Sequence, residues 1–424
     1  MPKIVVYTPT HHNKFILEAY NSLKNQTIDN WTWLLVPNGS SSIPDAIKSD
    51  KRVVAINWPV GLENIFETNI GALKNFACAQ AIQNGFGDIL VELDHDDILL
   101  PNCLEEILKA VTEDPESGFL YSDTIGFTES GESRIYSKKY GWEEYTKVVD
   151  GKLWKVMKTF PINARSLCEI FYSPNHVRCW TVDAYKRSGG YDPRRKVIDD
   201  HDLICRTYLA GVKFKYLGDA LYMQRAHSNS MSVKLNSLIQ TEQANVRNKF
   251  LLPLVKEWCK REGLQMFDLG GAHALESGFK SVDLYNSDII HDVTKGPWAD
   301  ENSVGVIRCA DFIEHIPIPD IIPFVNNVYK QLAPGGWWLT STPSTDGRGA
   351  FCDPTHVSFW NELSFRYYCD KNFSKYIPAM TARFQQVRLE TIKPTKWHVD
   401  NNVPYVICDM CALKGQRQPG DCHI

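Results

Sequence analysis

The decisive stretch of the sequence is ILVELDHDD at residues 89–97, where an apolar run passes into a turn rich in carboxylates. Such a run is typical of a buried strand, and it places the carboxylates at the carboxyl edge of a sheet, where open α/β sheets bind ligands. Carboxylate oxygens suit Mg²⁺ or Mn²⁺, which keep open positions for substrate phosphates. We therefore expect a metal and a nucleoside diphosphate at this turn. The alternative is a solvated acidic turn that binds neither.

The sequence on both sides of this stretch continues an α/β pattern. Further strands are predicted at residues 4–7, 31–36 and 53–56, and crossover helices at 16–23 and 70–77. This alternation is typical of a mostly parallel, Rossmann-like sheet covered by helices. Residues 117–232 do not continue this alternation of strands and helices, and they are richer in aromatic residues and Gly/Pro turns. We interpret them as a lobe that binds an acceptor substrate.

The second half of the chain begins a new series of elements. The stretch at 237–261 is polar, lacks glycine and carries apolar residues at mostly helical intervals, which predicts a connecting helix. A second alternation of strands and helices starts at residue 266 and predicts another Rossmann-like α/β domain. The expected division is a first domain at 1–232, a connecting helix at 233–262 and a second domain at 263–424.

Composition excludes several classes of protein. The 424 residues exceed what one hydrophobic core usually supports, and 43% hydrophobic with 23% charged residues is typical of a globular chain. A net charge of −4 disfavours a nucleic-acid partner. The N-terminus lacks the regions of a signal peptide, no apolar run reaches the ~18 residues of a membrane-spanning helix, and twelve scattered cysteines suit reduced thiols. We therefore expect a soluble, cytoplasmic protein.

The carboxylate turn belongs to an ordered series of motifs. LDHDDIL at 93–99 is preceded by Thr8-Pro9-Thr10 after the first strand, by Asn38-Gly39-Ser40 after the second, and by a helix that carries Lys74. This series resembles the Asp-x-Asp signature and the flanking motifs of GT-A glycosyltransferases of family 2. The donor-binding residues that the resemblance implies are Thr8, Pro9, Asn38, Lys74, Asp94 and Asp96.

The resemblance continues beyond that turn and implies a mechanism. Asp199-Asp200-His201-Asp202 is similar to the acidic motif of the family, in which the second acidic residue is the catalytic base, a role that falls to Asp200. His227 resembles the histidine that binds the metal, here together with Asp94 and Asp96. The implied reaction is an inverting sugar transfer, in which Mn²⁺ or Mg²⁺ neutralises the leaving diphosphate and Asp200 takes the proton of the acceptor hydroxyl.

Other residues bear on the donor base and the acceptor. The family commonly carries an aspartate before the Asn38 position, whereas Pro37 offers neither a carboxylate nor an N–H donor. A UDP-sugar remains the preferred donor, and a glycan or another hydroxyl compound the expected acceptor. The candidate acceptor-binding residues are Asn175, His176, Arg178, Trp180, Gly190 and Asp199. Purely structural roles are the alternative for them, because aromatic residues are usually part of the core.

The second half carries a motif of its own. Residues 267–271, FDLGG, predict a strand that ends in a glycine turn, which lets backbone N–H groups approach a cofactor. Together with later acidic residues and a second glycine turn, residues 264–345 resemble a class I S-adenosylmethionine-dependent methyltransferase, although Ala272 stands where a third glycine is usual. The implied cofactor contacts are Asp268, Gly270, Gly271, Asp283, Asp292 and Glu314. Alternatively, Asp283 caps a helix and Glu314 faces solvent.

The sequence thus predicts a metal-dependent glycosyltransferase that also methylates a hydroxyl group with S-adenosylmethionine. The first alternative is a glycosyltransferase whose second domain is an inactive scaffold. The second is a protein that binds nucleotide sugars without transferring them, and the third is a transferase that acts on modified nucleic acid.

Overall fold

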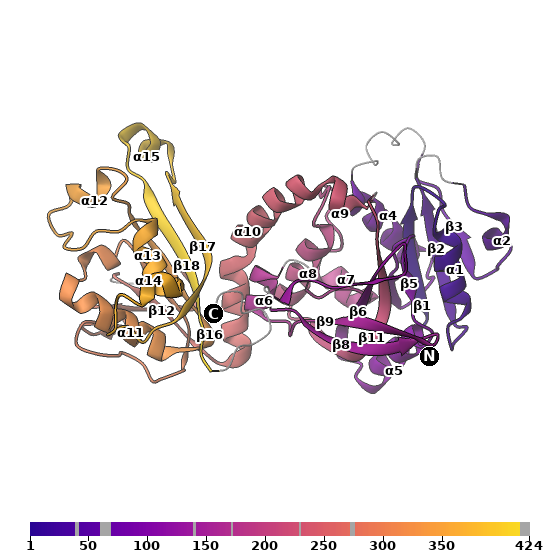
Figure 1. Cartoon of the computed structure of the whole chain (residues 1–424), viewed down its shortest axis with the longest axis horizontal. Coiled ribbons are helices and arrows are strands. Elements are labelled where there is room, and N and C mark those ends of the chain that lie inside the picture. The colour runs from indigo at the N-terminus through magenta and orange to yellow at the C-terminus, as the bar shows by residue number, and fades with distance from the viewer. Residues whose placement is uncertain are drawn as a thin grey trace. The chain divides into compact units, whose positions relative to one another are not determined.

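The computed structural model describes residues 1–38, 42–59, 69–138, 141–170, 173–228, 230–271 and 276–415. The chain divides into two compact units (Figure 1). Unit 1 comprises Met1–Ile162 and Ile170–Leu251, and unit 2 comprises Asn163–Glu169 and Leu252–Ile424. The second division point falls inside the long helix α10 (Asn236–Glu262). Each unit has its own sheet and its own hydrophobic core.

A block of parallel strands forms one half of the sheet of unit 1. The strands lie in the order β3 (Val53–Ala55), β2 (Trp31–Pro37), β1 (Ile4–Thr10) and β4 (Ile89–Glu92). They form where the sequence carries the predicted apolar runs. Because β1 pairs in parallel with both β2 and β4, the carboxyl ends of all three strands lie at one edge of the sheet. The carboxylate turn begins at that edge.

The other half of this sheet contains antiparallel pairs. β10 (Arg178–Thr181) lies between β4 and β6 (Ser117–Thr128) and is antiparallel to both. The remaining strands are β5 (Ile98–Leu99), β7 (Ser133–Arg134), β8 (Glu143–Val149), β9 (Lys152–Lys158) and β11 (Lys213–Ala226), of which only β11 pairs in parallel, with β6. The sheet is therefore mixed, and the expectation of a mostly parallel sheet is wrong for unit 1, because β10 reverses the strand direction beside β4.

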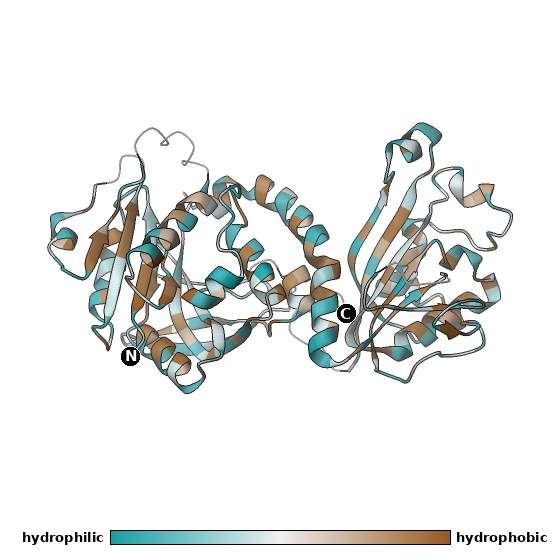
Figure 2. Ribbon diagram, turned by 180° about the vertical axis from the view of Figure 1, so that it is seen from behind, coloured by the Kyte–Doolittle hydropathy of each residue, from teal (hydrophilic) through white to brown (hydrophobic). Residues whose placement is uncertain are grey.

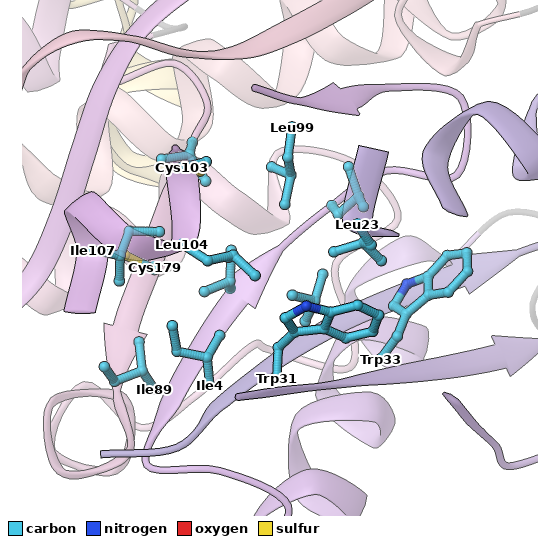
Figure 3. Packing of buried hydrophobic residues seen from close by; sticks show 14 of the residues in the cluster. Ile4, Leu23, Trp31, Trp33, Ile89, Leu99, Cys103, Leu104, Ile107 and Cys179 are labelled. Atoms are coloured by element: carbon cyan, nitrogen blue, oxygen red, sulfur yellow. The ribbon is translucent and has the colours of Figure 1, made fainter. Parts of the chain in front are cut away.

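Helices cover both faces of the parallel block. α1 (Ile16–Lys24) and α5 (Cys103–Glu113) share a core with residues of β1, β2 and β4, and Figure 3 shows Trp31, Trp33 and Leu104 within it. Side chains alternate along a strand, so the residues of β1 and β4 outside this core face α4 (Ile70–Gln83), which packs against β1 and β2. Further helices of unit 1 are α2 (Asp45–Lys48), α7 (Val182–Arg187), α8 (Asp199–Leu209) and α9 (Met231–Lys234).

Unit 2 is built on a sheet whose first strand lies in the interior. The order is β14 (Ile289–Ile290), β13 (Lys280–Asp283), β12 (Gln265–Leu269), β15 (Val304–Ala310), β16 (Leu332–Pro343), β18 (Tyr405–Ala412) and β17 (Phe384–Ile392). The strands from β14 to β16 are parallel, whereas β18 is antiparallel to both of its neighbours. The order reverses between β12 and β15, and such switch points are where open α/β sheets bind ligands at the carboxyl edge.

Short and long helices complete unit 2. They are α6 (Ala164–Glu169), η2 (Ile313–His315), η3 (Ile318–Asp320), α11 (Ile321–Gln331), α12 (Gly349–Cys352), α13 (Glu362–Cys369), α14 (Lys371–Ser374) and α15 (Lys396–Asn401). Figure 2 shows hydrophobic residues concentrated on the strands and hydrophilic residues on much of the outer helical surface. Within the described ranges, no helix combines the length and the apolar character needed to cross a bilayer.

Candidate active site

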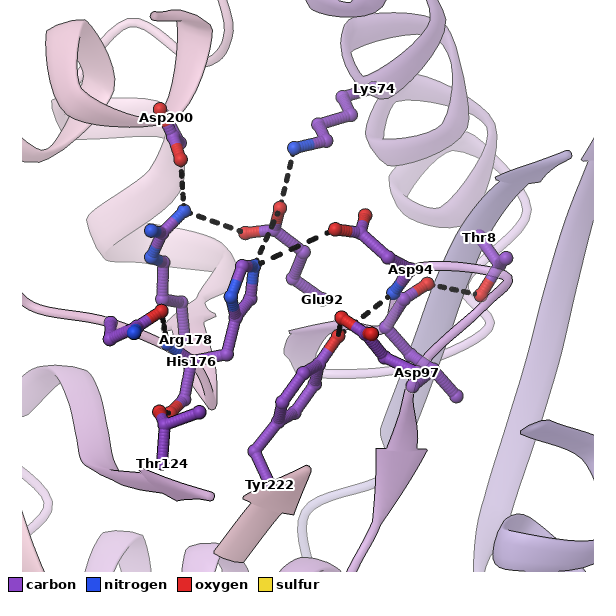
Figure 4. A network of polar contacts seen from close by, with 12 residues as sticks. Thr8, Lys74, Glu92, Asp94, Asp97, Thr124, His176, Arg178, Asp200 and Tyr222 are labelled. Atoms are coloured by element: carbon purple, nitrogen blue, oxygen red, sulfur yellow. Dashed lines mark hydrogen bonds and ion pairs between the residues drawn. The ribbon is translucent and has the colours of Figure 1, made fainter. Parts of the chain in front are cut away.

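The carboxyl ends of β1 and β4 are joined by a buried hydroxyl. The Thr8 hydroxyl donates a hydrogen bond of 2.6 Å to the carbonyl of Leu93 and accepts one of 2.9 Å from the indole of Trp33. Thr8 is fully buried, so the structure gives it the role of fixing the strand ends (Figure 4). Pro9 continues β1 beside β2, and the Asn38 amide donates to Thr10. Gly39 and Ser40 lie outside the described residues.

The turn at 94–97 is held by residues of β11. Tyr222 donates a hydrogen bond of 2.8 Å to Asp97, and its hydroxyl accepts one of 3.1 Å from the Asp94 amide. The Arg225 amide donates a second bond, of 2.7 Å, to the Asp97 carboxylate. Asp97 is buried, so it serves to position the turn. Asp94 and Asp96 remain as the carboxylates that this turn presents for binding.

Asp96 is paired with the predicted metal-binding histidine. Nε2 of His227 lies 2.8 Å from the Asp96 carboxylate. Burial favours the neutral form of Asp96, but the neighbouring His95 and the hydrogen bond with His227 outweigh it and lower the pKa of this carboxyl group. The two side chains come from segments 131 residues apart in the sequence. The structure therefore brings together two of the three predicted metal ligands.

Asp94, the third predicted ligand, faces a different partner. Its carboxylate lies 3.9 Å from Nε2 of His176, which is also 3.5 Å from Glu92 (Figure 4). Burial raises the pKa of Asp94, an effect that Lys74 and His176 partly offset. Among the described residues, Glu92, Asp94 and His176 form a group whose ligand atoms all lie within 4.8 Å of one another.

The groups that satisfy this spacing do not include the predicted trio. The described part of the chain holds two others, His11–His12–His95 and, in unit 2, Glu314–His315–His356, whereas Asp94, Asp96 and His227 are not gathered in this way. His11 and His12 follow β1, and His95 lies on the carboxylate turn, 3.1 Å from His12. Burial and the neighbouring imidazoles lower the pKa of His11 to about 4, so that it is neutral at pH 7 and can accept a metal.

Glu92 is the centre of a buried ionic network. It lies in β4 on the face toward α4, where Lys74 approaches its carboxylate to 2.5 Å, and Tyr191 donates a hydrogen bond of 3.3 Å to it. Burial alone would raise the pKa of Glu92, but the cationic side chains around it outweigh burial and hold the pKa well below its usual range. Glu92 was not among the residues predicted from the sequence, although a charged residue inside an apolar strand needs a partner.

Two acidic residues at the start of α8 complete the network. Asp199 lies 3.2 Å from Lys74, and Asp200 is bound by the Arg178 guanidinium (Figure 4). Burial raises the pKa of Asp199 to about 6; it outweighs the attraction of Lys74, and repulsion from Asp200 acts in the same direction as burial. For Asp200, burial is outweighed by Arg178 and Lys74, and the pKa falls to about 2. The network therefore contains one strong and one weak carboxylic acid side by side.

The backbone is strained at the residue directly before these two carboxylates. Ile198, the N-cap of α8, has φ of 62° in the left-handed region. A β-branched residue is rarely found there, and such strain costs about 1–3 kcal/mol where it persists. The helix N-terminus favours the negative charges of its first turn. The local sequence thus fixes Asp199 and Asp200 at the network despite an unfavourable backbone.

The other candidate acceptor residues lie deeper than expected. Trp180 is fully buried, and its indole donates to Thr207, so it packs within the core. Asn175 is also buried, where its side chain accepts a hydrogen bond of 2.9 Å from the His176 amide. Gly190 has φ of 65°, and a Cβ there would lie 2.9 Å from the ring of Tyr185. These three residues shape the surroundings of the ionic network.

The predicted cofactor contacts of unit 2 lie at the carboxyl ends of its strands. Asp268 in β12 accepts two hydrogen bonds from Arg308, and Gly270 follows that strand with φ of 88°. The amide and the hydroxyl of Thr294 both donate hydrogen bonds to Asp292, and these bonds lower the pKa of its carboxyl group. Asp283, at the end of β13, accepts from the Leu284 amide. Gly271 follows Gly270, and Ala272 lies outside the described residues.

Comparison with known proteins identifies the domain to which the first site belongs. The family model described as Glycosyl transferase family 2 matches residues 5–169. The chain carries a family 2 glycosyltransferase domain. The α/β fold of GT-A type predicted for the N-terminal part is thereby confirmed, with a mixed sheet. The matched range includes Lys74, Asp94 and Asp96, whereas Asp200 and His227 lie beyond it.

The relatives of this family 2 domain are distant. The chain is 20% identical to the hyaluronan synthase of Pasteurella multocida over 283 residues, which is 66% of this chain and 26% of the synthase. It is 24% identical over 223 residues to an uncharacterized glycosyltransferase of Methanocaldococcus jannaschii, covering 50% of this chain and 73% of that protein. The chain thus spans about a quarter of the length of the hyaluronan synthase.

Solved structures show limited likeness. TarS residues 1–349 of S. aureus, in complex with UDP-GlcNAc, give a TM-score of 0.42 at 16% identity, covering 61% of this chain and 73% of that TarS segment. The mannosyltransferase PcManGT of Pyrobaculum calidifontis, in complex with GDP-Man and Mn²⁺, gives a TM-score of 0.38 at 14% identity, covering 58% and 64% of the two chains.

Proposed function

We propose that unit 1 transfers a sugar from a nucleotide donor to a hydroxyl group of a glycan or another acceptor, with inversion at the anomeric carbon. The observation that carries this proposal is the pairing of Asp96 with His227 beside a buried network of carboxylates, within a chain that has a family 2 domain. A protein that only binds nucleotide sugars would not need two acidic residues held at a strained helix start. Transfer therefore fits the geometry better than binding alone.

The donor set suits a divalent cation. Asp96 and His227 would hold Mn²⁺ or Mg²⁺, with Asp94 of the same turn as the third proposed ligand. When bound, this ion supplies positive charge that stabilises the departing nucleoside diphosphate. Tyr222 and Asp97 keep the turn in place so that its carboxylates face the donor. A UDP-sugar is our preferred donor, with Thr8, Pro9 and Asn38 near its nucleoside.

Two further residues would act on the reacting groups. Lys74 contributes its positive charge from a buried position, because it is bound to Glu92 and Asp199. Asp200 is ionised at neutral pH and would accept the proton of the acceptor hydroxyl once that hydroxyl displaces Arg178. A single displacement of this kind inverts the configuration and needs no second carboxylate nucleophile. Asp199, His176 and Gly190 would lie around the acceptor.

Donor turnover tests this proposal. The full chain is incubated with Mn²⁺ or Mg²⁺ and a panel of nucleotide sugars with candidate glycan acceptors, and the released nucleoside diphosphate is measured. Asp96→Asn and Asp200→Asn should each lower the turnover rate, by about 10²- to 10⁴-fold for the base. Asp183→Asn is the matched control, because Asp183 is an exposed carboxylate in α7. Equal turnover by Asp96→Asn and the control would refute the assigned site.

We also propose that residues 263–424 form an S-adenosylmethionine-dependent domain of methyltransferase type, with a connecting helix at 233–262 between this domain and the first domain at 1–232. Support comes from the sheet order with its switch point between β12 and β15, and from acidic residues at successive strand ends. Calorimetry with S-adenosylmethionine tests this assignment. Binding that Asp283→Ala abolishes would support O-methylation, and no binding at millimolar cofactor would favour an inactive scaffold.

A further inference from the structure

A compact group of metal-binding side chains lies in unit 2, apart from the residues assigned to sugar transfer. Glu314 and His315 belong to the short helix η2, directly after β15, and His356 follows α12. Their ligand atoms all lie within 4.8 Å of one another. The segments that carry them follow the adjacent parallel strands β15 and β16, so the group sits at the carboxyl edge of the sheet.

Glu314 has a carboxylate oxygen that lacks a partner. The side chain is 2% exposed, which rules out the solvent-facing role considered from the sequence. Thr342 donates a hydrogen bond of 2.8 Å to Oε2, whereas Oε1 is buried and has no hydrogen-bond partner among the described residues. A buried carboxylate oxygen without a donor is costly, typically by about 1–3 kcal/mol or more. A bound cation would satisfy it.

The hydrogen bonds of the two histidines leave the same nitrogen free on each ring. Nδ1 of His315 lies 3.1 Å from the Thr355 carbonyl and 3.2 Å from the Thr355 hydroxyl, and this hydroxyl gives its own proton to Asp353. Nδ1 of His315 must therefore carry the hydrogen. Nδ1 of His356 likewise lies 3.0 Å from the carbonyl of Ala350. Nε2 of each ring then has a free lone pair, as in histidines that bind metals.

Backbone hydrogen bonds hold together the two segments that carry these side chains. The amides of Val357 and Ser358 both donate to the Glu314 carbonyl, at 2.9 and 3.0 Å. The Ser358 hydroxyl donates to the carbonyl of Ile313 at 3.0 Å. These bonds join the segment after His356 to η2, so the ligands are placed together before any ion binds. Asp353 accepts the hydrogen bond of the Thr355 hydroxyl and thereby fixes Thr355 beside His315.

We propose that Glu314, His315 and His356 form a binding site for a divalent transition-metal ion of the zinc type. Two imidazoles and one carboxylate are the protein ligands of known zinc sites that keep a fourth position open for water or substrate. Imidazole nitrogen favours such ions over Mg²⁺. Ligand atoms around a tetrahedral zinc ion lie roughly 3.3 Å apart. A bound ion would draw the three ligand atoms, which all lie within 4.8 Å of one another, to this spacing.

Metal titration of the full chain tests the site. Asp96→Asn serves as the background, so that a cation at the sugar-transfer site does not contribute. Zn²⁺ is measured by equilibrium dialysis, and Co²⁺ by the visible absorption of its tetrahedral complex. Glu314→Gln and His356→Gln should each remove one bound ion per chain or weaken its binding by more than 100-fold. Thr355→Val removes the hydroxyl contacts to His315 and Asp353 but keeps the carbonyl contact to His315, and it should weaken binding by about 10- to 100-fold.

The matched control is His398→Gln. His398 is another histidine of unit 2 whose Nδ1 bonds a threonine, here Thr395 at 2.7 Å, but it belongs to none of the metal-binding groups of the described residues. The control should bind Zn²⁺ as the background does. Thermal unfolding in the presence of a chelator shows whether each variant is folded. Unchanged stoichiometry and affinity in folded Glu314→Gln and His356→Gln would overturn the proposal, whatever the state of the sugar-transfer site.

Discussion

Asp199→Asn should change the way in which stability depends on pH. Asp199 is buried next to Asp200 and Glu92, and its pKa in the folded protein is about 6, compared with an ordinary value of 3.8. The folded state therefore holds this proton at pH values where the unfolded state has released it. Between pH 3.8 and 6, the contribution of Asp199 to the stability of the wild-type protein falls as the pH rises, because the folded state keeps a proton on Asp199 that the unfolded state has released. Asparagine does not titrate and removes this effect.

The size of the effect follows from the two pKa values. Their difference of about 2 corresponds to about 3 kcal/mol at 1.36 kcal/mol for each pKa unit. The unfolding free energy of Asp199→Asn, relative to wild type, should therefore increase by about 3 kcal/mol between pH 3.5 and pH 7. Loss of the contact with Lys74 adds a constant offset, because Glu92 keeps Lys74 paired. The change with pH, and not the absolute difference, is the quantity to compare.

Scanning calorimetry at several pH values measures this change. For a unit of 150–250 residues, 3 kcal/mol moves the melting temperature by roughly 6–12 °C. Asp183→Asn is the control, because it makes the same chemical change at an exposed carboxylate in α7. The transition of unit 1 is the one that should move. A difference between Asp199→Asn and wild type that stays constant from pH 3.5 to 7 would show that Asp199 is not a weakened acid.

Three further substitutions test the framework of the site. Tyr222→Phe should cost about 1–3 kcal/mol of stability and raise the KM for the nucleotide sugar, because the buried Asp97 carboxylate loses a hydrogen-bond donor. An unchanged free energy of unfolding and an unchanged KM would contradict this. Gly190→Ala should lower the melting temperature far more than Gly211→Ala. Both glycines have a positive φ, but only at Gly190 would a Cβ meet a neighbour, the ring of Tyr185. Equal shifts in melting temperature would argue against this crowding. Lys74→Met should cost about 3–5 kcal/mol in urea unfolding, because it leaves buried carboxylates unpaired, and a neutral result would disprove the network.

The sequence predicted those features that depend on local pattern. Apolar runs and helical spacing located β1, β2, β3 and β4 together with α1 and α4, but not the short helix α2 between β2 and β3. Because parallel strands share one carboxyl edge, the motif after β4 could be placed near the end of β1. The same reasoning located the strand ends of unit 2. In each case, the information lies within about ten consecutive residues.

The features that escaped prediction depend on pairing between distant segments. Nothing near Arg178 in the sequence indicates that β10 inserts antiparallel beside β4, which made the sheet mixed and brought Arg178 to Asp200. His176 and Glu92 meet for the same reason. Glu314 was assigned to solvent or to a cofactor, whereas contacts with a loop some 40 residues later bury it. Such contacts are set by tertiary packing and leave no periodic signal.

The buried ionic network itself argues that the site has a function beyond stability. Glu92, Asp199 and Asp200 face two permanent cations, Lys74 and Arg178, so full ionisation leaves one negative charge in excess. Replacing buried ion pairs by apolar residues is often neutral or stabilising, so stability does not account for such an arrangement. An excess carboxylate beside a strained helix start is useful where a proton has to be taken up. An acceptor hydroxyl would give up such a proton during sugar transfer, and this proton would restore the balance of charge in the network.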